Sequence, residues 1–340
     1  MDNNRIAAIQ KIEKERKSKV ICYLTGDRAQ FPTNIGEDVI PILYRHLELI
    51  GYQNKIDLFL YTRGGDMVVP IRIVKLIRNY CKSLSILVPY RCHSAGTLIC
   101  LGADEIVMTK LAELTPVDPT SQTHPFNPKM PNPANPLQQI TLPISVEDVR
   151  SYLAFAKEEL DAQDQQIVEL YSKMTNQSYP NITHLHPLAL GNVYRVQKMI
   201  KIITRRLLEM HFKITESNQD LTINKIIKEI TEDICVHNYP IYADEAKKLG
   251  LKISKPKDNQ EKLIWELFEL YSERMKLALP FNAIEELGIN PSMQGNCYGA
   301  YIESLNAEDA FNFIYDLTRH PQQANMPIFN MSKVQWEKIR

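Results

Sequence analysis

The sequence predicts an α/β protein with a mainly parallel β-sheet flanked by helices, and two observations carry this prediction. First, short apolar runs alternate with segments of helical periodicity between residues 20 and 109. This order is typical of parallel sheets that are covered by helices. Second, hydrophobic residues make up 44% of the 340-residue chain, which is enough to build a full core. Such sheets bind ligands at the carboxyl ends of their strands.

The elements of this region follow one another in a regular order. The apolar runs predict strands over 20–25, 55–62, 84–89 and 105–109. Apolar residues at helical spacing predict helices over 36–51, 67–81 and 95–103. Gly51 is a good helix stop, and Pro70 is tolerable only in the first turn of its helix. Two loops of unusual composition, "TRGGD" (62–66) and "RCHSAG" (91–96), leave the carboxyl ends of strands.

The rest of the chain changes character. Residues 119–143 contain seven prolines and no helical period, which predicts a surface arm. A helical region over 145–231 follows and begins with Ser145 as N-cap of a long helix that reaches about Met174. Further helices are expected over 186–213, 222–231, 242–250 and 259–279, a strand over 296–304, and a polar tail.

Charge and composition limit the classes of function. Lys and Arg together number 40 and so do Asp and Glu, which argues against nucleic acid or an anionic membrane as the main partner. The six cysteines form no C-x-x-C pair, so no metal site is expected, and Cys81, Cys92 and Cys100 are predicted to be buried free thiols. The charged N-terminal helix lacks the core of a signal peptide and no run is long enough to span a membrane. A cytoplasmic location is predicted.

Ser94 stands at a sharp turn between a strand and a helix, where its hydroxyl is predicted to be exposed. A serine nucleophile needs a base to take its proton and donors that hold the oxyanion. The N–H of Ala95 is available because early helix N–H groups lack internal partners. Gly64 and Gly65 allow close approach and can supply a second donor. From the residues alone, the alternative is that Ser94 is a helix N-cap and "GGD" a tight turn.

The motifs "YTRGGD", "CHSAGTLICLGADEIVMT", "LTPVDP" and "VHNYPIYADEAKKLGL" resemble the Clp-fold serine proteinases. The most similar group is the serine dehydrogenase proteinase family, which is related to signal peptide peptidase A and to the Clp protease subunit. The resemblance covers roughly residues 18–255 and implies a Clp/crotonase-like fold, peptide hydrolysis and assembly into oligomers. It implies that Ser94 is the nucleophile, and that Gly65, beside Gly64, and Ala95 form the oxyanion hole.

The catalytic base is where this sequence departs from the Clp pattern. Asp118 stands where the Clp subunit has its histidine, and His237 stands near the place of the acidic residue. Because a triad is defined by geometry rather than chain order, our hypothesis is that His237 is the base and Asp118 orients it. The alternative, on the pattern of the signal peptide peptidases, is a Ser–Lys dyad with Lys129 as base, which requires that this lysine be buried.

The preferred reading is therefore a cytoplasmic serine endopeptidase that needs no metal or organic cofactor. Its expected partners are a peptide or unfolded segment, bound as an added strand, and further copies of the chain in a homo-oligomer. The predicted domains are an N-terminal helix (1–17), a Clp-like domain (18–255) and a C-terminal extension (256–340). Two other readings stay open: a catalytically silent polypeptide-binding ring scaffold, and a crotonase-like enzyme acting on an acyl thioester.

Overall fold

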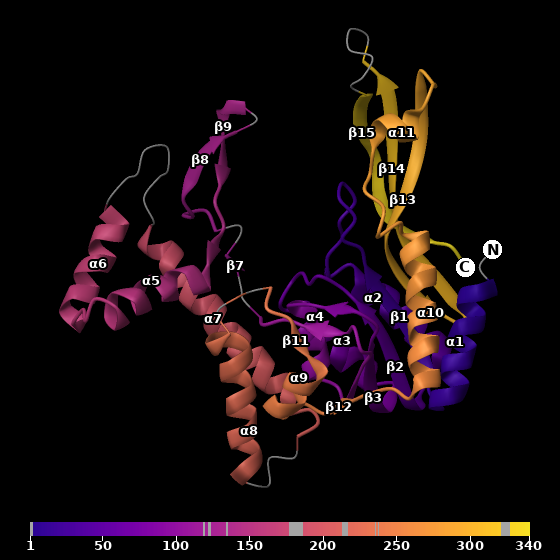
Figure 1. The fold of residues 1–340 in the computed structure, drawn as a ribbon, viewed down its shortest axis with the longest axis horizontal. Coiled ribbons are helices and arrows are strands. Elements are labelled where there is room, and N and C mark those ends of the chain that lie inside the picture. The colour runs from indigo at the N-terminus through magenta and orange to yellow at the C-terminus, as the bar shows by residue number, and fades with distance from the viewer. Residues whose placement is uncertain are drawn as a thin grey trace. The chain divides into compact units, whose positions relative to one another are not determined.

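The computed structural model describes residues 3–117, 120–121, 124–133, 135–176, 186–212, 217–234, 236, 238–320 and 327–340. The chain divides into two compact units, coloured by sequence in Figure 1. The first unit comprises Met1–Thr115, Leu207–Ile226 and Asn238–Arg340. The second comprises Pro116–Arg206 and Ile227–His237. Each unit is considered by itself below.

The first unit is built on an eight-stranded sheet with the order β12-β5-β3-β2-β1-β13-β14-β15. Its first five strands are parallel, and β13, β14 and β15 continue it in antiparallel fashion. The bounds are β1 Lys19–Thr25, β2 Gln53–Tyr61, β3 Cys81–Val88, β5 Glu105–Met108, β12 Ile253–Ser254, β13 Ser292–Ser304, β14 Ala307–Arg319 and β15 Pro327–Lys338. The predicted mixed α/β architecture with a mostly parallel sheet is confirmed.

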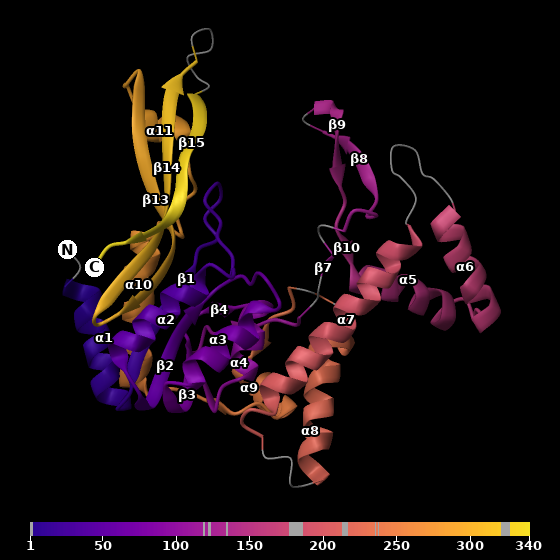
Figure 2. The same ribbon diagram turned by 180° about the vertical axis from the view of Figure 1, so that it is seen from behind.

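Helices cover this sheet, and their apolar faces form its core. The bounds are α1 Asn3–Arg16, α2 Val39–Ile50, α3 Val69–Arg78, α4 Ala95–Leu101, α8 Ser217–Lys228, α9 Ala243–Leu249, α10 Asp258–Arg274 and α11 Ala283–Leu287. Figure 2 shows α10 beside α1, and buried residues of both helices pack in one cluster with Phe59, Tyr61 and Tyr301 of the sheet. A small sheet of β4 (Arg91–Cys92), β6 (Glu113–Leu114) and β11 (Ile241–Tyr242) adjoins the carboxyl ends of the parallel strands.

The second unit holds the proline-rich arm and most of the helical region. It contains β7 Thr120–Ser121, β8 Lys129–Asn132, β9 Asn135–Thr141, β10 Ile144–Ser145, α5 Val146–Glu158, α6 Asp164–Asn176, α7 Pro187–Leu208 and a π-helical turn over Glu229–Asp233. Strands β8 and β9 form an antiparallel hairpin. The Ser145 hydroxyl accepts the Asp148 N–H at 3.2 Å, as the predicted N-cap requires. The buried apolar cluster of Ile144, Ala189 and Val193 in this unit is small.

Two expectations about local structure are corrected. The helix predicted over 145–174 is broken: α5 ends at Glu158, α6 starts at Asp164, and Asp161 between them has a φ of 51°. The tail predicted to be polar contains β14 and β15. Strand β14 pairs with β13 on one side and β15 on the other, and all but one of its residues are buried or half-buried. All strands and helices predicted between residues 20 and 109 are present within a few residues of their expected bounds.

The structure bears on the predicted burial of three cysteines and on the length and apolar character of the helices. Cys81, Cys92 and Cys100 are buried free thiols, as expected, and so are Cys22 and Cys297. Burial raises the pKa of the Cys22, Cys81, Cys92 and Cys297 thiols. In the described part of the chain, none of the helices combines the length and apolar character that crossing a bilayer demands.

Candidate active site

Ser94 immediately precedes α4 in a strained backbone conformation. Its φ is 51° and its ψ is −109°, and its hydroxyl makes no capping bond to the helix. A non-glycine residue persists in such a conformation only when its surroundings hold it there. The Ser94 N–H donates to the Thr115 hydroxyl at 2.9 Å, and the Ser94 carbonyl accepts the Leu98 N–H at 3.2 Å. Ser94 therefore stands at the N-cap position of α4 on a sharp elbow, but its hydroxyl is not used to cap the helix.

Thr115, which holds this elbow, is itself fixed by a second buried threonine. The Thr97 hydroxyl lies 2.8 Å from the Thr115 carbonyl and 3.1 Å from the Cys92 carbonyl. The Thr115 N–H lies 3.2 Å from the same Thr97 oxygen. Both threonines are buried. Two residues 18 positions apart in the chain thus form one hydrogen-bonded support for Ser94.

The "TRGGD" loop reaches Ser94 because β2 continues its pairing beyond Tyr61. The Thr62 N–H donates to the Arg91 carbonyl and the His93 N–H donates to the Thr62 carbonyl, both at 3.0 Å. The Thr25 hydroxyl donates to the Thr62 hydroxyl at 2.7 Å, and this same Thr62 oxygen accepts the Gly64 N–H at 3.0 Å. The carboxyl ends of β1 and β2 are thereby joined to the nucleophile loop.

The two glycines of this loop are required for different reasons. Gly64 has a φ of 115°, and a Cβ there would lie 3.0 Å from the Ser94 Cβ. Gly65 has a φ of 149°, and a Cβ there would lie 2.3 Å from the Ile35 carbonyl oxygen. Gly64 therefore allows the loop backbone to touch Ser94, whereas Gly65 allows it to pair with residue 35.

Two backbone N–H groups beside Ser94 have no hydrogen-bond partner among the described residues: those of Gly65 and Ala95. In the pairing with Ile35, the bonds are made by the Gly64 carbonyl and the Asp66 N–H, so the Gly65 N–H points away from that partner. The Gly64 N–H is already donated to Thr62. Of the three predicted oxyanion-hole residues, Gly65 and Ala95 thus have an N–H available for a ligand.

The Ser94 hydroxyl contacts the Met67 sulfur at 3.8 Å, and only 3% of the residue is exposed. Among the residues that the structure describes, no titratable side chain is hydrogen-bonded to this hydroxyl. The predicted triad partners Asp118 and His237 lie outside the described residues. Lys129, the alternative base, is an exposed residue of β8 in the second unit.

His93, which precedes the nucleophile, is hydrogen-bonded on the opposite side of the elbow. Its Nε2 lies 3.0 Å from the Glu113 carboxylate. Burial, which outweighs the opposing effect of Glu113, lowers the pKa of His93 to about 4. His93 is therefore a neutral imidazole bound to Glu113.

Charged residues also surround the base of the "TRGGD" loop. The Asp27 carboxylate lies 2.7 Å from Arg63 and 3.2 Å from Arg91. Burial alone would raise the pKa of Asp27, but the hydrogen bond and charge of Arg63 hold it below its ordinary value. The loop next to Ser94 is consequently anchored by a carboxylate that stays ionised.

Sequence reasoning missed a second group of a serine, a histidine and an aspartate. His46 Nδ1 lies 2.9 Å from the Ser304 hydroxyl, and its Nε2 lies 2.9 Å from the Asp309 carboxylate. All three side chains are fully or almost fully buried, with His46 at 0% and Ser304 at 1% exposure. Because its three members come from α2, β13 and β14, we assign this group to holding α2 against the two strands.

Comparisons with known proteins place the elbow and the glycine loop within a recognised family pattern. The family model of the ClpP-like SDH-type serine proteinases matches residues 1–130. This match confirms the resemblance over the segment that contains Ser94 and both loops.

Two relatives are similar to this chain over most of its length, and one solved structure is less similar. Two uncharacterized proteins of Methanocaldococcus jannaschii, MJ1495 and MJ0137, are each 24% identical to this chain and align with 80% of it and with 77% and 80% of their own lengths. The catalytic domain of the ClpP protease from Plasmodium falciparum is 13% identical, with a TM-score of 0.34 and coverage of 76% of this chain and 93% of that domain.

Proposed function

We propose that this chain, whose first 130 residues carry the pattern of the ClpP-like SDH-type serine proteinases, hydrolyses peptide bonds with Ser94 as nucleophile. The observation that carries the proposal is the elbow at Ser94, where the backbone is strained and the N–H groups of Gly65 and Ala95 lack partners. Strained backbone of this kind is concentrated at functional sites. The family match supports peptidase activity in general, and the geometry supports these particular residues.

The chemistry follows from the groups at the elbow. The Ser94 oxygen attacks the peptide carbonyl carbon while a base removes the hydroxyl proton, and the carbonyl oxygen becomes an oxyanion. The N–H groups of Gly65 and Ala95 are the donors for that oxyanion. Collapse of the tetrahedral intermediate expels the amine, which takes the proton from the base. Water then hydrolyses the Ser94 ester by the reverse sequence of proton transfers.

The base in this proposal is His237, with Asp118 orienting its imidazole. Two features support it. Asp118 stands where the family pattern has its histidine, and His237 stands near the place of the acidic residue. In addition, none of the described titratable side chains is hydrogen-bonded to the Ser94 hydroxyl. Lys129 is the alternative base. Its exposure on β8 argues against that role, because a lysine base must lose its charge through burial.

We infer that the substrate binds as an extended strand along the outer edge of the glycine loop. One side of this loop pairs with Ile35, so the Gly65 N–H and carbonyl face the other side, where a peptide backbone can pair with them. The Met67 side chain covers the hydroxyl at 3.8 Å, so substrate entry requires this thioether to move. A flexible Met side chain makes that movement cheap.

We also propose that the protein assembles as a homo-oligomer. The helices α5, α6 and α7 expose large apolar side chains, namely Tyr152, Phe155, Val168, Leu188, Tyr194 and Ile202. Exposed apolar surface of this extent marks an interface, and like copies of one chain form closed assemblies. Light scattering at micromolar concentration tests this. A monomeric mass would refute it.

A serine-directed fluorophosphonate probe tests the nucleophile. We expect rapid labelling of the wild-type chain and none of Ser94→Ala, which removes a single oxygen. Ser304→Ala is the matched control, because it removes the buried serine of the other His–Asp group and should leave labelling intact. Labelling that survives in Ser94→Ala would overturn the assignment.

Variants of the two candidate bases decide the mechanism. His237→Ala should reduce peptide hydrolysis about as much as Ser94→Ala does. Asp118→Asn should reduce it by up to about 10⁴-fold, and Lys129→Ala should have little effect. The rate should rise with an apparent pKa near 6–7, as a histidine base requires. The reverse order of the His237 and Lys129 variants would favour the dyad.

One observation keeps the silent scaffold as a second candidate. Ser94 is 97% buried, and its hydroxyl contacts only a thioether among the described residues. A chain that binds polypeptides without cleaving them would fail to react with the fluorophosphonate probe but would still retain an unfolded protein on a column. The probe experiment therefore separates the two functions.

A further inference from the structure

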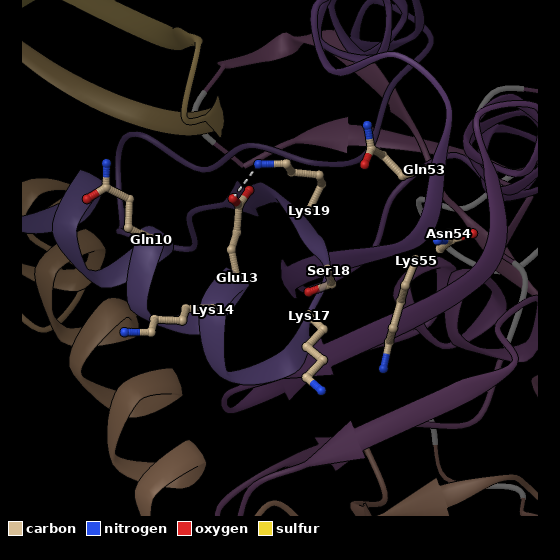
Figure 3. A pocket seen from close by; sticks show the side chains of 9 residues that line it. All are labelled: Gln10, Glu13, Lys14, Lys17, Ser18, Lys19, Gln53, Asn54 and Lys55. Carbon is tan, nitrogen blue, oxygen red and sulfur yellow. Dashed lines mark hydrogen bonds and ion pairs between the residues drawn. The ribbon is translucent and has the colours of Figure 1, made fainter.

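A basic cleft lies at the amino-terminal edge of the parallel sheet, where β1 and β2 begin. Its volume is about 450 Å³, within the range of small-molecule sites. It is lined by Gln10, Glu13, Lys14, Lys17, Ser18, Lys19, Gln53, Asn54 and Lys55, as Figure 3 shows. The side chains come from α1, the turn after it, and the first residues of the two strands.

The charges of this cleft are unbalanced. Lys19 is paired with Glu13 at 2.8 Å, and Lys55 is paired with Glu105 at 3.1 Å. Beneath them, Arg16 is paired with the buried carboxylate of Asp57 at 2.5 Å. These three cations and three carboxylates cancel.

Two lysines remain after this pairing. In the described part of the chain, neither Lys14 nor Lys17 has a carboxylate within ion-pair distance, and both are exposed. The cleft therefore presents two uncompensated positive charges. Figure 3 shows the Lys17 and Lys55 side chains extending in the same direction, while Lys19 turns toward Glu13.

Lys17 stands in a backbone conformation that favours glycine. Lys17 has a φ of 50° and follows the last residue of α1, and the Ser18 N–H donates to the Glu13 carbonyl at 3.2 Å. This is the left-handed helix end at which glycine is the favoured residue. A lysine adopts that conformation with strain.

We propose that this cleft binds a small phosphorylated molecule through its phosphoryl group. A phosphate monoester carries nearly two negative charges and three strong acceptor oxygens, and lysine binds phosphate as a point charge. Lys14 and Lys17 supply two positive charges, and since Figure 3 shows these exposed side chains extending in different directions, binding requires that they turn toward the same phosphoryl group. The amides of Gln10 and Asn54 in the lining supply neutral donors. The remaining volume accommodates the organic part of the ligand.

The cleft is independent of the proposed active site. It adjoins Lys19 and Gln53, the first residues of β1 and β2, whereas the glycine loop follows Tyr61, the last residue of β2. Parallel strands place these residues at opposite edges of the sheet. Binding should therefore persist unchanged in Ser94→Ala, and it does not depend on peptidase activity.

Isothermal titration of the full chain with inorganic pyrophosphate and with inorganic phosphate at low ionic strength tests the proposal. We expect saturable binding of both, tighter for pyrophosphate. Lys14→Gln and Lys17→Gly should each weaken it about fivefold or more. Lys17→Gly should also leave the melting temperature unchanged or raise it, because it relieves the strained helix end. A loss of binding from this variant cannot then be attributed to unfolding.

Lys11→Gln is the matched control, because it removes the same charge from the same helix outside the cleft. It should not change pyrophosphate affinity. Succinate, a dicarboxylate, should bind at least tenfold more weakly than phosphate. Equal losses in Lys11→Gln and Lys14→Gln, equal affinity for succinate, or no heat of binding for pyrophosphate would each overturn the proposal.

Discussion

Thr115→Val removes the acceptor of the Ser94 N–H without changing the size of the side chain. The bond is 2.9 Å long, and Ser94 and Thr115 are 3% and 1% exposed. An N–H left unsatisfied in such a place costs about 1–3 kcal/mol. The strained Ser94 conformation costs a similar amount and depends on this bond. We therefore expect the free energy of unfolding to fall by about 1–3 kcal/mol.

The same change should disturb the nucleophile. If the loss of about 1–3 kcal/mol appears in full as a higher activation free energy for the reaction of Ser94, its fluorophosphonate labelling rate should fall between about 5-fold and 150-fold. Urea unfolding measures the stability, and labelling is followed under conditions where both proteins are folded. Thr109→Val is the matched control, because the buried Thr109 hydroxyl donates to the Pro89 carbonyl at 2.7 Å. It should lose comparable stability and label at the wild-type rate. Wild-type labelling by Thr115→Val would refute the reasoning.

Three further variants or conditions have expected outcomes. Gly65→Ala should abolish labelling, since its Cβ would lie 2.3 Å from a backbone oxygen, whereas Gly191→Ala, with open space around it, should not. His46→Ala should lower the free energy of unfolding by about 2–3 kcal/mol, measured in urea, and leave labelling unchanged. The folded-state pKa of His93 is about 4, below its unfolded value near 6.5, so its contribution to stability is present above pH 6.5 and lost as the pH falls toward 4. His93→Gln should flatten that dependence.

The sequence by itself determined most of the local elements and predicted the type of chemistry. Apolar periodicity located every element between residues 20 and 109 except the two-residue strand β4, because these elements are buried and their apolar patterns reflect that burial. The small residues around Ser94 and in "GGD" indicated a place where a ligand approaches backbone. In contrast, β14 and β15 were missed because β14 lacks a regular alternation of buried and exposed residues and β15 is mostly exposed. Their pairing with neighbouring strands, rather than their own pattern, places them in the sheet.

Only the tertiary structure decided which groups at the site are available. The sequence does not distinguish Gly64 from Gly65. In the structure, the Gly64 N–H donates a hydrogen bond to the Thr62 hydroxyl, whereas the Gly65 N–H makes no hydrogen bond to the described residues. The strain at Ser94 is held by Thr115, which lies 21 residues later in the chain. Hydrogen bonds of this kind join segments that the packing of the sheet brings together. The spacing of residues along the chain does not show which N–H donates to which acceptor.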